Sequence, residues 1–135
     1  MHNSQAMNAY QHISTSSGID SASPQKLIQM LLDGALENIA AAKGNLMRSE
    51  TAAKGERIGK AISIVEGLRT SLDLDAGELS DNLQELYQYV GRRLVEANMN
   101  DNVTILDEVA DLLNEIKSAW DVVAVERVIE TQQPA

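Results

Sequence analysis

The stretch that decides the fold is SPQKLIQMLLDGALENIAAAKGNLMR, residues 23–48. Ser23 is suited to cap the N-terminus of a helix, and Pro24 fits the first helical position, where its missing N–H is not needed. Apolar side chains then recur every three or four residues, which is the period of one helix face. They are Leu27, Ile28, Leu31, Leu32, Ala35, Leu36, Ile39, Ala42 and Leu46. The stretch predicts an amphipathic helix over residues 24–48.

Three further segments have the same period and are separated by short breaks. They predict helices over residues 51–72, 79–97 and 102–130. We expect Ser49 or Thr51 to cap the first of these helices, and Asp101 to cap the last one after a turn at residues 98–101. The inner face of the helix over 79–97 is expected to hold Leu79, Leu83, Leu86, Tyr87, Val90, Leu94 and Ala97.

Four amphipathic segments joined by short connections favour an all-α fold, an antiparallel four-helix bundle over residues 23–131. Aromatic residues make up only 3% of the chain, and no β-branched run alternates with polar residues, so strands are not expected. Residues 1–22 are rich in Ser, Asn and Gln and carry few apolar side chains. We expect them to form a flexible N-terminal segment that docks on something else.

Composition and charge exclude several classes of protein. The chain has 135 residues, enough for one domain with a core, and 11 basic against 20 acidic residues give a net charge of −9. Such a charge disfavours binding to nucleic acid and to anionic membranes. There is no cysteine, and hence no disulfide or thiolate metal site. No secretory signal or membrane-length apolar run is present, so we expect a cytoplasmic protein without membrane insertion.

Residues that would support catalysis or metal binding are missing from the pattern. A di-iron bundle needs Glu-x-x-His pairs, but the only histidines are His2 and His12, both in the N-terminal segment. The stretch DLDAGE, residues 73–78, faintly resembles a calcium loop, but its glycine falls one place too early. There is no glycine-rich phosphate loop and no nucleophile elbow. We therefore expect no enzyme, no metal and no cofactor.

The apolar stripes on the first and fourth helices are wider than a small bundle needs. One interpretation is a broad, ordinary core; the other is an apolar groove that takes the amphipathic helix of a partner. Two apolar residues of the N-terminal segment, Tyr10 and Ile13, could reach such a groove. Arg92 and Arg93 interrupt the third helix, and one of them is expected to pair with Asp33 or Asp73 on a neighbouring element.

Several motifs, in the same order, resemble those of the flagellin-specific export chaperones, the FliS family. They are ASPQKLIQMLLDGA (22–35), LRTSLD (68–73), GELSDNL (77–83), LYQY (86–89), RRLVEAN (92–98) and Ala119-Trp120. The resemblance covers residues 10–121. It departs from the family pattern at Ala76-Gly77, where Gly-Gly is common, and beyond Asp121, where the valine-rich end matches nothing in the pattern.

The resemblance implies a four-helix bundle with Tyr10 docked on it. It implies a cytosolic chaperone that binds the disordered C-terminal region of flagellin, prevents premature polymerisation and aids delivery to the flagellar type III export apparatus. The export apparatus and other flagellar proteins are further partners that it allows, and it implies no nucleotide or metal. Apolar surplus and motif position together give the candidate client-binding residues. These are Tyr10, Ile13, Leu27, Met30, Leu31, Tyr87, Val90, Leu94, Leu113, Ile116 and Trp120. The alternatives are a self-associating structural bundle and a regulator of another flagellar protein.

Overall fold

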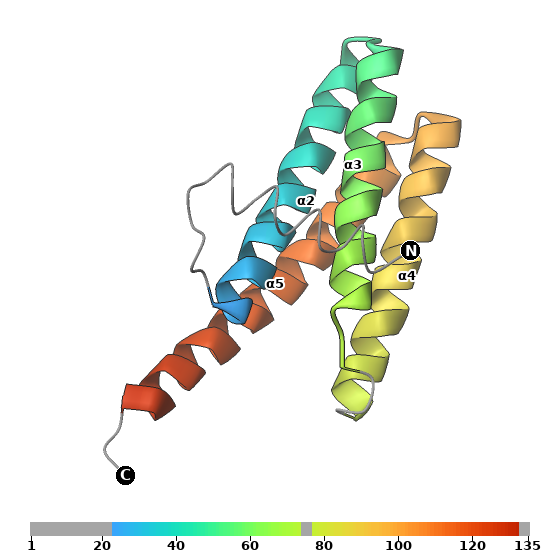
Figure 1. Ribbon diagram of the computed structural model, residues 1–135. Coiled ribbons are helices and arrows are strands. Elements are labelled where there is room, and N and C mark those ends of the chain that lie inside the picture. Colours follow the sequence, from blue (N-terminus) through green and yellow to red (C-terminus); the bar gives the residue numbers. More distant parts are fainter. Residues whose placement is uncertain (1–22, 74–76, 133–135) are drawn as a thin grey trace.

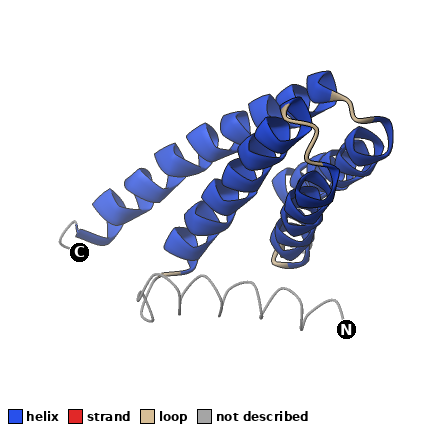
Figure 2. Ribbon diagram, turned by 90° about the horizontal axis from the view of Figure 1, so that it is seen from above, coloured by secondary structure: helices blue, strands red, loops and turns tan. Residues whose placement is uncertain are grey.

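The structure is a computed structural model that describes residues 23–73 and 77–132, with side chains up to Val122. Its helices are α2 (Pro24–Met47), α3 (Thr51–Thr70), α4 (Glu78–Asn100) and α5 (Val103–Gln132). The predicted ranges differ from these bounds by at most three residues. Every described element is a helix or a short connection (Figure 2), which confirms the all-α fold.

The four helices form a ring in which sequential helices run antiparallel (Figure 1). α2 packs against α3, α3 against α4, α4 against α5, and α5 returns to α2, while the backbones of the described diagonal helices do not approach one another closely. The C-terminal turns of α5 extend past the start of α2, beyond the rest of the bundle. Among the described helices, none combines the length and the hydropathy that a membrane span requires.

The start of α2 follows the local rules of the sequence. Ser23 caps the helix, and its Oγ accepts a hydrogen bond from the backbone N–H of Lys26 at 3.2 Å. Pro24 occupies the first turn. Both expectations are confirmed.

The cap expected for α3 is wrong. The N-cap is Glu50, whose side chain makes no capping hydrogen bond, while Ser49 lies in the preceding turn with a φ of 59°. The Glu50 carboxylate instead accepts hydrogen bonds from Asn45 at 2.8 Å and Arg48 at 2.9 Å. These bonds fix the turn between α2 and α3 from the α2 side.

The turn between α4 and α5 is also shorter than the sequence suggested. Residues 98–100 continue α4, and Asp101 ends it in the left-handed conformation, with φ 50° and ψ 49°. Aspartate tolerates that conformation better than most residues do. Asn102, not Asp101, caps α5, because its Oδ1 accepts from the backbone N–H of Ile105 at 3.3 Å.

The core takes up most of the apolar width noted in the sequence. The apolar residues of α5 form two neighbouring stripes, and the first turns of both are buried: Ile105 and Val109 on one, Leu106 and Leu113 on the other. The remaining core residues come from the other three helices. They are Leu31, Leu32, Ala35, Ile39, Ala42, Ile58, Ala61, Val65, Leu68, Tyr87, Val90, Leu94 and Ala97. Farther along α5, Leu112, Ile116 and Trp120 are only half-buried. The broad-core interpretation therefore holds for the buried part of each stripe, and docking at the half-buried part stays a prediction.

Candidate functional site

An open groove of about 690 Å³ runs between α4 and α5. We call it the α4–α5 groove. Leu86 and Tyr89 of α4 form one wall, and six residues of α5 form the other. Those six are Thr104, Asp107, Glu108, Asp111, Leu112 and Glu115. Leu86 and Leu112 supply apolar side chains, and carboxylates line the α5 side.

Helix geometry places exposed apolar residues on both sides of this groove and beyond it. Leu86 is 36% exposed, and Leu79, seven residues or about two turns earlier on the same face, is 70% exposed. Val122 is exposed seven residues after Glu115 on α5. The expected inner-face positions of Leu79 and Leu86 are therefore wrong. Adjacent residues of a helix lie 100° apart, and Tyr87 takes the core position next to Leu86.

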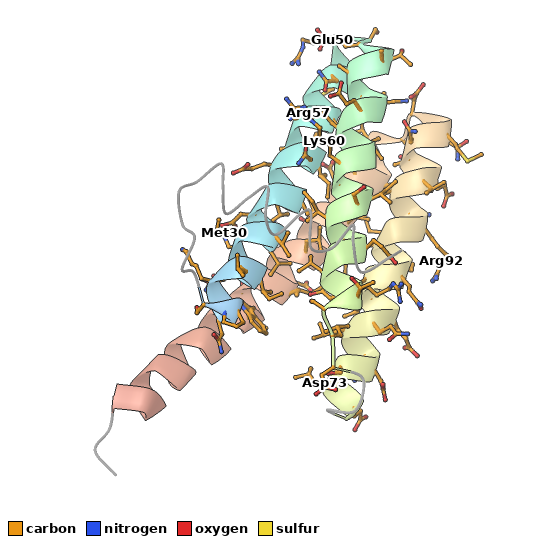
Figure 3. The ribbon with its side chains drawn as sticks, in the orientation of Figure 1. Met30, Glu50, Arg57, Lys60, Asp73 and Arg92 are labelled. Carbon is orange, nitrogen blue, oxygen red and sulfur yellow. The ribbon has the colours of Figure 1, made fainter. Side chains whose placement is uncertain are left out.

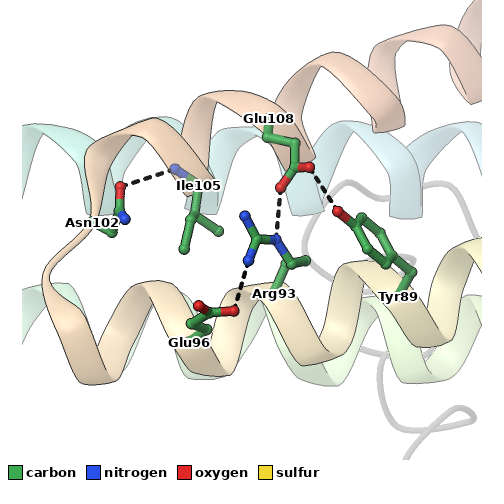
Figure 4. Close-up of polar contacts among 6 residues, drawn as sticks. All are labelled: Tyr89, Arg93, Glu96, Asn102, Ile105 and Glu108. Carbon is green, nitrogen blue, oxygen red and sulfur yellow. Dashed lines mark hydrogen bonds and ion pairs between the residues drawn. The ribbon is translucent and has the colours of Figure 1, made fainter.

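A polar network fixes the groove at its centre (Figure 4). The hydroxyl of Tyr89 donates to one oxygen of Glu108 at 2.7 Å, and Nε of Arg93 donates to the other at 2.8 Å. Arg93 also donates to Glu96 through Nη1 at 2.6 Å. The hydrogen bond from Tyr89, followed by that from Arg93, lowers the pKa of Glu108, and the same bond raises the pKa of Tyr89. Both oxygens of Glu108 are thus occupied by partners on α4.

This network corrects the expected partners of the arginine pair. Arg93 pairs with Glu108 of α5 rather than with Asp33 or Asp73. Asp33 instead accepts from Lys117 at 2.7 Å, and this contact raises the pKa of Lys117. Arg92 is exposed and points away from the bundle (Figure 3).

A buried lysine holds the turn that joins the two walls of the groove. Lys54 of α3 is the one charged residue buried among the described side chains. Its Nζ donates to the backbone carbonyl of Asn98 at 3.0 Å and to the carboxylate of Asp101. The last carbonyls of a helix have no partner within it, so Lys54 satisfies one of the terminal carbonyls of α4.

A second set of contacts fastens α5 to the start of α2. The indole N–H of Trp120 donates to the carbonyl of Gln25 at 3.1 Å. The amide of Gln29 donates to Asp121 at 2.9 Å. These bonds set where α5 leaves the bundle.

The structure places the sequence-derived candidates in three groups. Leu31, Tyr87, Val90, Leu94 and Leu113 are buried in the core, where no client can reach them without opening the bundle. Leu27, Met30, Ile116 and Trp120 are half-buried near the end where α2 begins. Tyr10 and Ile13 lie outside the described residues. Client contact at all of these positions stays a prediction.

Of the nine candidates that lie within the described residues, none lines the α4–α5 groove. The residues that the sequence interpretation missed are Leu86, Tyr89 and Leu112. The sequence held no clear signal for this, because Leu86 lies four residues before buried Val90 and therefore shares its helix face.

Comparison with known proteins bears on this site. A family model described as "Flagellar protein FliS" matches residues 6–127. The chain belongs to the FliS family. It is 47% identical over 122 residues to the flagellar secretion chaperone FliSB of Pseudomonas aeruginosa, covering 90% of this chain and 97% of that protein. The resemblance found in the motifs is confirmed.

Other FliS proteins match over a similar span. Identity to the flagellar secretion chaperone FliS of Salmonella typhimurium is 41% over 122 residues, which is 89% of this chain and 90% of the relative. Identity to FliS of Vibrio cholerae is 38% over 117 residues, 86% of each chain. The family match contains every residue of the α4–α5 groove as well as Val122.

Proposed function

We propose that this FliS family member is a cytoplasmic export chaperone, a binding protein rather than an enzyme, whose client is the C-terminal region of flagellin. The client binds along the α4–α5 groove. The observation that carries this proposal is the partly exposed apolar stripe formed by Leu79, Leu86, Leu112 and Val122. The relatives of this chain are named flagellar secretion chaperones, which supports the same class of function.

The length of the stripe suits a segment that folds as it binds. Ordering a disordered segment costs a few kcal/mol, so the contact must be long. From Thr104 to Val122, α5 rises about 27 Å at 1.5 Å per residue. That length accommodates a client helix of about 18 residues. A client that polymerises through its own apolar stripe is kept from doing so while that stripe is covered.

The half-buried candidates form a second proposed contact area. Leu27 and Met30 on α2, and Ile116 and Trp120 on α5, are spaced three and four residues apart and so share a face on each helix. We place a further part of the client there. Tyr10 and Ile13 are proposed to dock on the bundle when no client is bound.

Leu86→Asp tests the groove, with Val95→Asp as its matched control. Val95 is 47% exposed, and it lies nine residues after Leu86, half a turn around α4. Both variants are titrated calorimetrically with the C-terminal segment of flagellin from the same organism. We expect wild type and Val95→Asp to bind one to one with gain of helicity, and Leu86→Asp to bind at least tenfold more weakly, because a charge replaces an apolar contact.

Equal binding by the two variants would place the client elsewhere. Binding by neither variant nor wild type would refute the proposed client. The exposed stripe also fits a second copy of this chain, and sedimentation over a range of concentrations decides that alternative. A structural bundle would associate on its own, whereas we expect the chaperone to stay monomeric without its client.

A further inference from the structure

One wall of the α4–α5 groove carries a row of carboxylates. Asp107, Asp111 and Glu115 are spaced four residues apart, so they lie above one another on α5 over about 12 Å. Asp107 is paired with Lys43 of α2 at 2.7 Å. Within the part of the chain that the structure describes, Asp111 and Glu115 have no hydrogen bond or ion pair. Like charges at this spacing repel, so the helix gains nothing from them internally.

We infer that the segment that occupies the α4–α5 groove is an amphipathic helix with lysine or arginine along the edge that faces α5. The inference rests on the proposed function and specifies the chemistry of the client at this groove. The apolar stripe of such a helix covers Leu86 and Leu112. Two cations three or four residues apart at its edge then match the spacing of Asp111 and Glu115.

Charge argues against the two other available occupants. Residues 1–22 of this chain contain no lysine or arginine and one aspartate, so they bring no long basic side chain to the carboxylate row. A second copy of the chain carries a net charge of −9 and would be repelled. A basic-edged partner segment satisfies both the apolar floor and the charged wall.

The first experiment removes the two unpaired charges. Asp111→Asn combined with Glu115→Gln is compared with Glu37→Gln combined with Glu56→Gln, which removes two negative charges from exposed positions of α2 and α3. The probe is the flagellin C-terminal segment used above. We expect roughly three- to tenfold weaker binding for the groove variant than for the control, since each exposed ion pair contributes modestly. Added salt should weaken wild type and control more than the groove variant.

The second experiment separates this inference from the identity of the client. Two synthetic amphipathic helices share one leucine stripe and carry either lysine or glutamate at its edge. The wild-type chain should prefer the lysine peptide, and the groove variant should lose that preference more than the control does. If flagellin binds but neither probe distinguishes groove variant from control, the inference is overturned and the proposed function stands. If flagellin fails to bind while the lysine preference holds, the charge preference stands and the proposed client is wrong.

Discussion

Replacing Lys54 by methionine tests how the walls of the groove are held together. Methionine keeps most of the apolar stem of this buried side chain and removes the ammonium group. The change takes away the hydrogen bond to the carbonyl of Asn98 at 3.0 Å and the ion pair with Asp101. It also removes the cost of keeping a charge away from water.

The lost contacts outweigh the relieved desolvation. Leaving a part-buried carbonyl without a partner costs about 1–3 kcal/mol. The side chain of Asp101 is 58% exposed and regains water, so its contribution is well below the 3–5 kcal/mol typical of a fully buried broken pair. We expect Lys54→Met to lower the free energy of unfolding by about 2 kcal/mol. With an unfolding entropy near 2.1 cal/mol/K per residue, that corresponds to a melting temperature roughly 7 °C lower.

Urea and thermal unfolding, followed by circular dichroism, measure the effect. Lys60→Met is the control, because Lys60 is exposed on the same helix and pairs with exposed Glu56 only at 3.4 Å. We expect that variant to lose less than about 0.5 kcal/mol. Asp101→Asn should lower the free energy of unfolding by an amount between those of Lys54→Met and Lys60→Met, since asparagine also tolerates the left-handed conformation. If Lys54→Met lowers the free energy of unfolding no more than Lys60→Met does, the Lys54 ammonium makes no net contribution to stability and the argument is refuted.

Three other predictions follow from the contacts described above. Hydrogen bonds from Tyr89 and Arg93 depress the pKa of Glu108 in the folded protein. They therefore stabilise the fold fully at pH values above the unfolded-state pKa of about 4.5, and this stabilisation is lost as the pH falls through the lower folded-state pKa. The melting temperature of wild type should therefore drop more steeply below pH 5 than that of Glu108→Gln; parallel curves would contradict this. Trp120→Phe should cost about 1 kcal/mol in urea unfolding through loss of the bond to Gln25, and fluorescence of this single tryptophan in wild type should change together with helicity. Leu31→Ala, at a fully buried site, should cost about 2–5 kcal/mol by calorimetry, and a cost below 1 kcal/mol would show that the site collapses around the cavity.

Periodicity predicted the fold well because it is a property of each helix alone. The apolar spacing in residues 24–48 and the Ser23-Pro24 start fix α2 without reference to its neighbours. Choosing between adjacent apolar residues needs more information. Leu86 and Tyr87 are both apolar enough for the core, but the positions of α3 and α5 decide that Tyr87 is buried and Leu86 lines the groove.

Polar partners were harder to predict, since they depend on the register between helices. Arg93 reaches Glu108 because α4 runs on to Asn100 and the turn that follows is short. An α4 ending three residues earlier, as the pattern suggested, would shift that register. The same error made Asp101 look like a cap for α5, whereas its backbone ends α4 and its carboxylate pairs with Lys54.

The groove follows from how α4 and α5 diverge. Near their turn, Lys54 and Arg93 bridge the elements, and the carboxylates they meet are occupied. Farther from the turn the two helices separate (Figure 1), and exposure along one face of α4 rises from 36% at Leu86 to 70% at Leu79. The carboxylates of α5 also lose partners with distance from the turn. Both oxygens of Glu108 accept hydrogen bonds, whereas Glu115, two turns later, has no ion pair among the described residues. Apolar surface and unpaired charge therefore become available together. A client should gain most of its contact energy at the end of the groove far from the turn, so Leu79→Asp should weaken binding more than a change at Thr104 does.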